Sequence, residues 1–152
     1  FKLIFIFYIS MFLLKTMLIY YYFFMKNIHL CLCQSGKKYI ECCGPFIQMK
    51  KKPQTAVQVM RSRYTAYNIG DFDYIRHTCA EDALILFDIH DDKQKLNGVR
   101  LDVLSAIESE DKGEVVFKAY YEKQGRIYYM HEHSFFKKIE NRWVYVRGEQ
   151  LS

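Results

Sequence analysis

The sequence predicts an α+β protein in which the helices come first and a meander of antiparallel strands follows. Apolar residues recur at helical spacing between about residues 53 and 77, whereas they alternate with a period of two over most of 98–149. Tyr and Phe number 13 and 12 in a chain of 152 residues, and aromatic residues favour strands with one buried face. With 51% hydrophobic and 26% charged residues, the composition indicates one globular domain with a small appendage.

The helical part starts at PQTAVQVMRSRYTAYNIGD, where Pro53 suits a first helical turn and Gly70 suits the end of the helix. One face of this helix is apolar and consists of Ala56, Val57, Met60, Tyr64 and Tyr67. The next segment, DFDYIRHTC, predicts a second, shorter helix with Asp71 as its N-cap. Two consecutive helices are therefore expected before the sheet.

Strand-like runs follow these helices. LILFDI (84–89) is short and apolar, and in 98–109 we expect one side to carry Val99, Leu101, Val103 and Ser105. The segment 113–149 predicts three antiparallel strands with turns near KQGR and IENR. On the middle strand, alternation places Glu132 on one face with Met130, Ser134 and Phe136, and places His131 and His133 on the other face.

The first 25 residues consist almost entirely of Phe, Ile, Leu, Tyr, Met and Lys. A run of this length could span a bilayer, but Lys15 would place a charge inside the lipid. Because A and T bases alone can encode most of these residue types, we interpret residues 1–25 as a hydrophobic leader that arises from a misplaced start or a translated spacer. We expect Met25 to be the functional start of a cytoplasmic protein, with a membrane anchor as the alternative. The net charge of +5 is too small to indicate DNA as a partner.

Four of the five cysteines lie within CLCQSGKKYIECC, residues 31–43. Two cysteines on a short turn and two on the returning chain suit tetrahedral Zn²⁺, with Zn–S distances near ~2.3 Å. Disulfides or free buried thiols are the alternatives, but disulfides need an oxidising compartment and adjacent cysteines bridge only with strain. Four thiolates would leave no open position, so we expect a structural zinc site. A segment as short as 29–45 has no core of its own, so its folding should depend on the metal.

This run resembles the SEC-C motif, a zinc knuckle that is also found at the C-terminus of the SecA translocation ATPase. The usual form is Cys-Pro-Cys-Gly-Ser-Gly-Lys-Lys-Tyr, which ends in Cys-Cys or Cys-His. Here Leu32 replaces the usual Pro and Gln34 replaces the usual Gly. The resemblance implies that the zinc ligands are Cys31, Cys33, Cys42 and Cys43.

Several further motifs are similar to those of the YchJ-like family of bacterial proteins. These motifs are CCGPF, PQTAVQVMRSRYTAY, GDFDYI, HEHSFF and RWVYVRGE, in that order, over about residues 29–149. The chain departs from the family at His133, where Arg is usual, and at Val116, where acidic residues are common. The resemblance implies a SEC-C knuckle at 29–45 and a nuclear-transport-factor-2-like domain at 53–150. That domain is cone-shaped, with helices packed into a curved antiparallel sheet.

Cones of this kind often hold a pocket, which serves catalysis in some relatives and binding in others. If the face of Glu132 lines the cone, Arg61 or Arg63 on the first helix would pair with this buried carboxylate. The pair is either a structural contact between helix and sheet, which we favour, or the centre of a small-molecule enzyme. The candidate pocket residues are Arg61, Arg63, Tyr64, Tyr67, Glu132 and Trp143.

The knuckle is also a candidate binding surface, because Lys37, Lys38 and Tyr39 lie on its turn. The resemblance to the SecA knuckle implies contact with a protein partner or the ribosome. The favoured function is therefore that of a zinc-binding accessory or adaptor protein, and the enzyme is the alternative. An enzyme predicts an open pocket with a titratable group of shifted pKa, whereas a binding module predicts a filled or apolar cone and an exposed knuckle.

The outer face of the sheet is a candidate homodimer surface, because cone domains often dimerise there. Tyr129, His131 and His133 are expected on this face. The two histidines have no third ligand nearby in the sequence, so we do not expect a second metal site.

Overall fold

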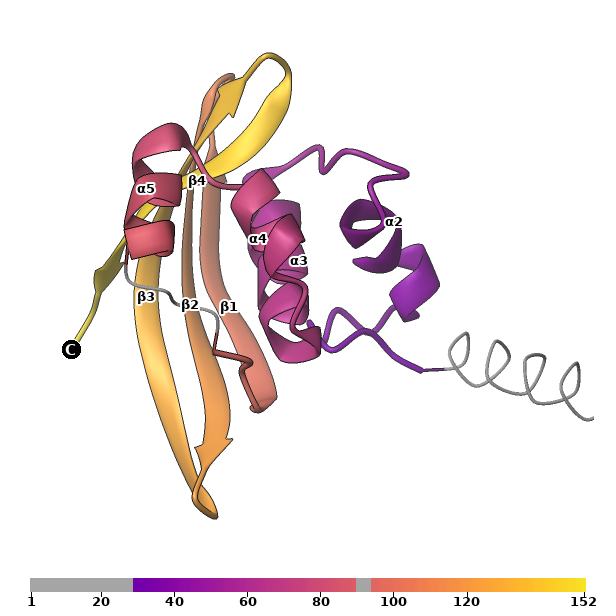
Figure 1. Cartoon of the computed structure of the whole chain (residues 1–152), viewed down its shortest axis with the longest axis vertical. Helices are drawn as coiled ribbons and strands as arrows, with labels where there is room; N and C mark the ends of the chain where they lie inside the picture. Colours follow the sequence, from indigo (N-terminus) through magenta and orange to yellow (C-terminus); the bar gives the residue numbers. More distant parts are fainter. Residues whose placement is uncertain (1–28, 90–93) are drawn as a thin grey trace, which may run out of the picture.

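The computed structural model describes residues 29–89 and 94–152, and the segment 1–25 with its proposed start at Met25 lies outside these ranges. Within them, no helix is long and apolar enough to cross a membrane. The chain begins with the knuckle, whose 3₁₀ helix η1 spans Tyr39–Glu41 and whose helix α2 spans Gly44–Ile47. Helices α3 (Ala56–Ile69), α4 (Phe72–His77) and α5 (Glu81–Ile89) follow. In Figure 1, α3 and α4 lie between the sheet and the knuckle.

Four strands form one antiparallel sheet in the order β1-β2-β3-β4. They are β1 (Gly98–Glu108), β2 (Lys112–Lys123), β3 (Arg126–Ile139) and β4 (Arg142–Gln150). Two-residue turns join the last three strands, and positive φ at Gln124–Gly125 and at Glu140–Asn141 suits the twist of a tight hairpin. The predicted meander of α+β class is confirmed, and both predicted turns are in place.

Helix α3 begins later than predicted, at Ala56. Thr55 is its N-cap, since the Thr55 side chain accepts a hydrogen bond from the Gln58 backbone N–H. Pro53 precedes this cap, so the prediction that it occupies the first helical turn is wrong. The end at Gly70 (φ 80°) is confirmed, as is the Asp71 cap of α4, which accepts a hydrogen bond from the Tyr74 N–H at 3.0 Å.

The prediction of a strand at 84–89 is wrong, because these residues belong to α5. A short apolar run does not by itself distinguish a strand from a buried helix. Here Ala83 and Phe87, four residues apart, are buried on one face of the helix, whereas Ile85 and Leu86 are exposed. Acidic residues in the first turn add a favourable interaction with the helix dipole.

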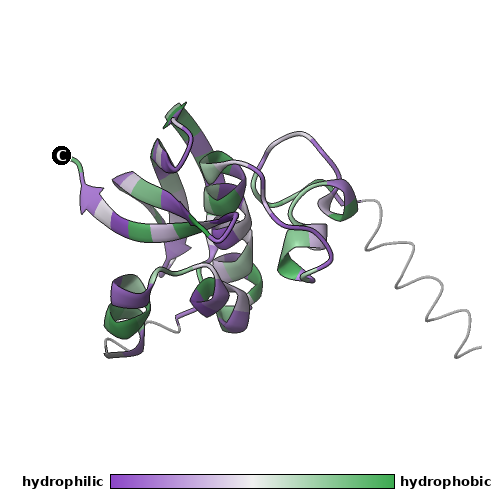
Figure 2. Ribbon diagram, turned by 90° about the horizontal axis from the view of Figure 1, so that it is seen from above, coloured by the Kyte–Doolittle hydropathy of each residue, from purple (hydrophilic) through white to green (hydrophobic). Residues whose placement is uncertain are grey.

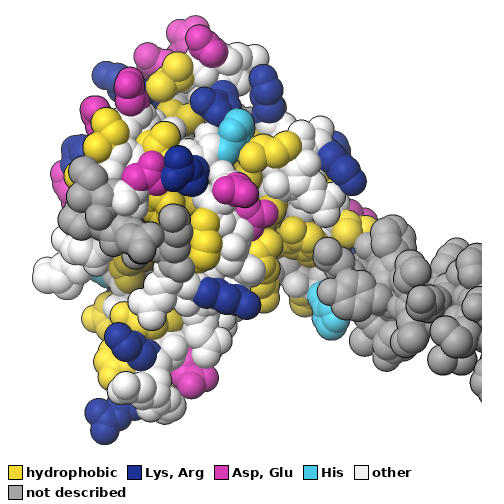
Figure 3. Space-filling model, viewed as in Figure 1, with side chains coloured by type: hydrophobic (Ala, Val, Ile, Leu, Met, Phe, Trp, Pro, Cys, Tyr) yellow, Lys and Arg dark blue, Asp and Glu magenta, His cyan; other side chains and the backbone are white. Residues whose placement is uncertain are grey.

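The concave face of the sheet packs against α3 (Figure 2), and together these two elements provide most of the core. Leu101 and Val103 face inward as predicted, but the register of β1 shifts at Val99 and again between Val103 and Ser105. These irregularities place Ser105 opposite Val116 and leave Val99 exposed, so the predicted four-residue stripe is wrong at both ends. Acidic and basic side chains are intermixed on the face that Figure 3 shows.

Candidate functional site

The four clustered cysteines converge at one point of the knuckle, with all four Sγ atoms within 4.8 Å of one another. A tight turn presents the first pair, closed by a hydrogen bond from the Cys31 N–H to the Lys37 carbonyl at 2.8 Å. Gln34 and Gly36 adopt positive φ in this turn. The second pair lies at the junction of η1 and α2.

The spacing of the sulfurs fits a tetrahedral metal ion. The Cys33–Cys42 and Cys42–Cys43 sulfur distances are 3.5 and 3.8 Å, close to the ~3.8 Å edge of a tetrahedron with metal–sulfur distances of ~2.3 Å. Cys31, Cys33 and Cys43 are buried, and Cys42 is half-buried. These four residues could therefore hold one metal ion and fill its coordination sphere.

Thiolates, rather than thiols, bind metals, and the knuckle favours a thiolate at Cys42. Hydrogen bonds from Cys43 and from the Ser35 hydroxyl lower the pKa of Cys42 to about 6, against the opposing effect of burial. The Ser35 Oγ lies 3.1 Å from the Cys42 sulfur. Ser35 thus supports the sulfur cluster from outside it, a role that the motif resemblance alone did not predict.

Side-chain contacts attach the knuckle to the main domain. The Arg61 guanidinium donates to the Cys33 carbonyl at 2.6 Å, and the Cys31 sulfur lies 3.8 Å from the Thr65 hydroxyl. Gln34 donates to the Val99 carbonyl of β1 at 2.8 Å. The substitution of the usual Gly by Gln34 therefore adds a contact between knuckle and sheet. Arg61, a predicted pocket residue, lies instead on the knuckle side of α3.

The predicted knuckle surface is only partly exposed. Lys37 and Lys38 are exposed, whereas Tyr39 is half-buried. The Tyr39 ring packs over Gly44, where a Cβ atom would lie 2.9 Å from the ring. Three apolar side chains of the knuckle are also exposed, which the sequence analysis did not single out: Leu30, Leu32 and Ile40.

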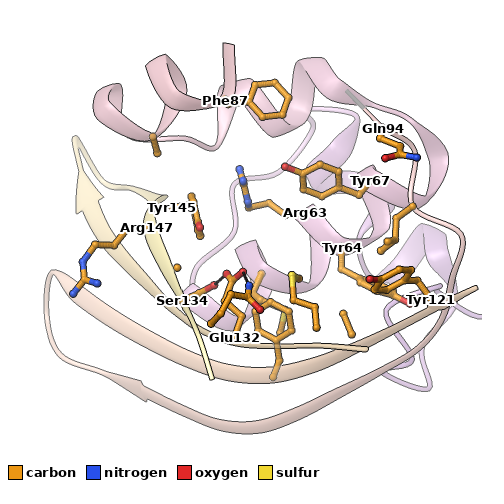
Figure 4. A pocket seen from close by; sticks show the side chains of 18 of the residues that line it. Arg63, Tyr64, Tyr67, Phe87, Gln94, Tyr121, Glu132, Ser134, Tyr145 and Arg147 are labelled. Carbon is orange, nitrogen blue, oxygen red and sulfur yellow. Dashed lines mark hydrogen bonds between the residues drawn. The ribbon is translucent and has the colours of Figure 1, made fainter. Parts of the chain in front are cut away.

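A cavity of about 1000 Å³ lies between α3, α5 and the concave face of the sheet (Figure 4). Four of the predicted pocket residues line it: Arg63, Tyr64, Tyr67 and Glu132. The sequence analysis did not place several apolar residues of its wall in a pocket, including Phe87, Phe117, Tyr121, Met130, Phe136 and Tyr145. Alternation along the strands indicated the correct face for most of them, but not that a cavity is open there.

Trp143 does not line the cavity, although it shares the inward face of β4 with Tyr145. Its indole is buried and donates to the Gln54 carbonyl at 3.0 Å, beside the start of α3. Gly113 also lies against the indole, since a Cβ atom there would be 3.2 Å from the ring. Trp143 is therefore a core residue that joins the segment before α3 to the sheet.

Arg63 is the buried cation of the cavity. Its Nη1 donates to the Ile75 carbonyl and to the Thr78 hydroxyl, both at 2.8 Å, and to the Cys79 sulfur at 3.4 Å. Its guanidinium stacks on the Tyr145 ring, 4.5 Å from the centroid. The link between α4 and α5 holds Tyr145 in place, because the Ala80 N–H donates to the Tyr145 carbonyl at 2.7 Å.

Glu132 enters the cavity from β3 and accepts hydrogen bonds from the Ser134 hydroxyl and, at 3.3 Å, from the Gln150 amide. Gly148 leaves the room for this carboxylate, since a Cβ atom at that position would overlap it. Burial raises the pKa of Glu132, although the Ser134 hydrogen bond and the positive charge of Arg63 oppose the shift. The expected ion pair with Arg61 or Arg63 is absent from the salt bridges of residues 29–89 and 94–152.

The convex face of the sheet carries Tyr129, His131 and His133, as the alternation predicts. His133 contacts the Glu114 carboxylate at 2.9 Å, and the Lys118 ammonium lies 5.2 Å from the centroid of the Tyr129 ring. Homodimerisation through this face stays a prediction.

The fold and the cysteine cluster define a class of protein, namely a cysteine knuckle attached to a cone-shaped α+β domain. Residues 55–148 match the family described as "YchJ, middle NTF2-like domain". A UPF0225 protein of Sodalis glossinidius is 35% identical, over 80% of this chain and 83% of its own. A UPF0225 protein of Deinococcus radiodurans is also 35% identical, over 76% of this chain and 85% of its own. The chain therefore belongs to the YchJ-like family of UPF0225 proteins.

Two solved structures share this fold. One is the solution structure of a SEC-C motif containing protein from Rhodopseudomonas palustris. It is 36% identical with a TM-score of 0.75, over 82% of this chain and all (100%) of its own. The other is the crystal structure of a sec-c motif containing protein from Psychrobacter arcticus. It is 24% identical with a TM-score of 0.70, over 81% of this chain and 83% of its own, and it supports the fold alone.

Proposed function

We propose that this protein binds a small organic molecule in its cavity and that a zinc ion in the knuckle holds the knuckle against α3. The observation that carries the first part is the cavity of about 1000 Å³. It contains the buried cation Arg63 and the half-buried carboxylate of Glu132, which form no ion pair with each other in the described residues. Ligand sites in proteins are typically concave and mostly apolar, with a few polar groups that orient the ligand. A cone that served only as a scaffold would be filled by its own side chains.

An enzyme would use the same cavity, with Glu132 as its acid or base. Its raised pKa and its hydrogen bond from Ser134 suit such a role. Ligand binding is therefore the first requirement of both the binding and the enzyme hypotheses, and it is the property to test first.

Zinc is the metal that the chemistry of the knuckle favours. Four thiolates in a tetrahedron select zinc or iron–sulfur chemistry over oxygen-preferring metals, and one ion with four sulfurs forms a closed structural site. The Rhodopseudomonas palustris structure is described as a SEC-C motif containing protein, which supports the same assignment. The zinc ion would tie the turn before η1, which carries Cys31 and Cys33, to the junction of η1 and α2. It would thereby hold the contacts of Cys31 and Cys33 with α3 in place.

Titration with the neutral probe 2-naphthamide tests the cavity. We expect saturable binding at one site per chain, with shifted amide resonances on the concave faces of β2 and β3. Ala119→Met should weaken binding about tenfold, because the longer side chain occupies the cavity floor. The matched control is Lys118→Met, on the convex face of the same strand, which should bind normally. Equal binding by both variants, or no saturable binding to the wild-type protein, would contradict the proposal.

A second candidate function is docking of the knuckle on a partner, as in an adaptor protein of the cytoplasm. It is favoured by three exposed apolar side chains, Leu30, Leu32 and Ile40, beside the exposed Lys37 and Lys38. An acidic protein surface, or the ribosome, would suit this combination of apolar and basic groups.

Affinity capture with the wild-type protein and with a Lys37→Glu, Lys38→Glu variant tests this docking. We expect an acidic partner or ribosomal particles to be captured by the wild type only, and capture to fall as salt rises. Identical capture by both proteins would show that the knuckle serves only as a structural attachment.

A further inference from the structure

We propose that the cavity selects ligands that carry a carboxylate on an apolar, ring-sized body, with Arg63 as the anion-binding group. This inference rests on the proposed function of the cavity and specifies the chemistry of its ligand. It depends on the juxtaposition of a buried guanidinium and an aromatic wall.

The guanidinium of Arg63 is buried without a counter-charge in contact. Arg63 is 8% exposed, and its three hydrogen bonds all leave from Nη1 to neutral acceptors. Because no buried nitrogen of the described residues lacks a partner, its Nε and Nη2, which form none of these hydrogen bonds, keep some contact with solvent. Arg63 also lines the cavity. A buried charge is costly without a partner, and the planar guanidinium offers paired N–H donors that match a carboxylate. A ligand carboxylate would satisfy both requirements.

Glu132 does not fill this role. Its carboxylate is oriented by Ser134 and Gln150, and the Tyr145 ring stacks on the Arg63 guanidinium. Figure 4 shows Arg63 and Glu132 entering the cavity from different elements, α3 and β3. Glu132 and Tyr145 therefore leave Arg63 able to bind a further anion.

The charge of the lining also favours an anion. Among the described residues of the wall and mouth, three are basic and two are acidic: Arg63, Lys95 and Lys123 against Glu122 and Glu132. Arg147 is not counted, because its guanidinium stacks on Phe135 and pairs with Glu149. A cavity with an excess of one sign attracts ligands of the other sign and raises their local concentration.

Aromatic side chains surround the space beside Arg63 and specify the rest of the ligand. The wall includes Tyr64, Tyr67, Phe87, Phe117, Phe136 and Tyr145. Aromatic rings provide large apolar contact areas and favour offset or edge-to-face packing against another ring. We therefore infer a flat or compact apolar body rather than a sugar or another highly polar ligand.

Three probes that share one apolar body and differ in charge test this inference: 2-naphthoate, 2-naphthamide and protonated 2-naphthylmethylamine. Calorimetric titration of the wild-type protein should give about tenfold tighter binding of the acid than of the amide, as expected for a charged hydrogen bond. Arg63→Gln should abolish this preference, and Arg63→Lys should retain only part of it. The matched control is Arg100→Gln, on the convex face of β1, which loses the same charge and should keep the full preference.

A measurement on the wild-type protein keeps the test independent of the folding of the Arg63 variants. In a nitrogen-detected titration, 2-naphthoate should shift the Nε–H resonance of Arg63 markedly more than 2-naphthamide does. If the three probes bind equally, or if the ammonium probe binds tightest, the carboxylate inference is overturned while the cavity remains a binding site. If none of the probes binds, the inference and the proposed function of the cavity both fail.

Discussion

The double substitution Cys42→Ser, Cys43→Ser is expected to abolish the proposed zinc binding and to unfold the knuckle, residues 29–47. The loss of a structural metal is among the few changes that cost more than about 4 kcal/mol. The segment cannot compensate with a core of its own, because its buried apolar residues are mainly the cysteines themselves and Ile47. The effect should reach the main domain, since the contacts of Arg61 and Thr65 with the first cysteine pair would be lost.

Metal analysis and denaturant unfolding measure this effect. The wild-type protein should contain one zinc ion per chain and the double variant almost none, and chelation of the wild type should reproduce the destabilisation. Cys79→Ser is the matched control, because Cys79 lies outside the cluster and should leave the zinc content unchanged. Full zinc content in the double variant would refute the assignment of the ligands, and unchanged stability after zinc loss would refute its structural role.

Replacement of Trp143 by alanine should lower the free energy of unfolding by about 3–5 kcal/mol. The indole is 2% exposed, packs against Gly113 and donates to the Gln54 carbonyl at 3.0 Å. The Lys138 ammonium also lies over the indole, 5.0 Å from the ring centroid. The substitution removes this packing and the hydrogen bond together.

Urea unfolding followed by circular dichroism measures the change, since Trp143 is the only tryptophan and its fluorescence is lost in the variant. Trp143→Phe retains most of the packing and should cost clearly less. The folded fraction of Trp143→Ala should still bind 2-naphthamide with wild-type affinity, because the indole does not line the cavity. A large loss of affinity with little loss of stability would instead make Trp143 a pocket residue.

Features that depend on neighbours along the chain could be predicted from the amino-acid sequence. The cysteine cluster could be predicted because its four members lie within 31–43, where a short turn suffices to bring them together. The cap at Asp71, the end at Gly70 and both hairpin turns depend on local backbone preferences, which individual residue types reveal. Alternation along β3 likewise separated Glu132 from His131 and His133, because the period of a strand is a local property.

Packing between distant parts of the chain selects which of two equivalent arginines enters the cavity. Arg61 and Arg63 are two residues apart, so they point about 200° apart around α3. One therefore reaches the knuckle and the other the cavity.

Trp143 and Tyr145 share a strand face, yet the segment before α3 covers the first, and the link between α4 and α5 holds the second beside Arg63. The pattern of the apolar run at 84–89 does not distinguish a strand from a helix. Its packing over the sheet decides that it is a helix. The cavity itself depends on how completely side chains from α3, α5 and the sheet fill the space between them, and this is a property of contacts between residues far apart in the chain.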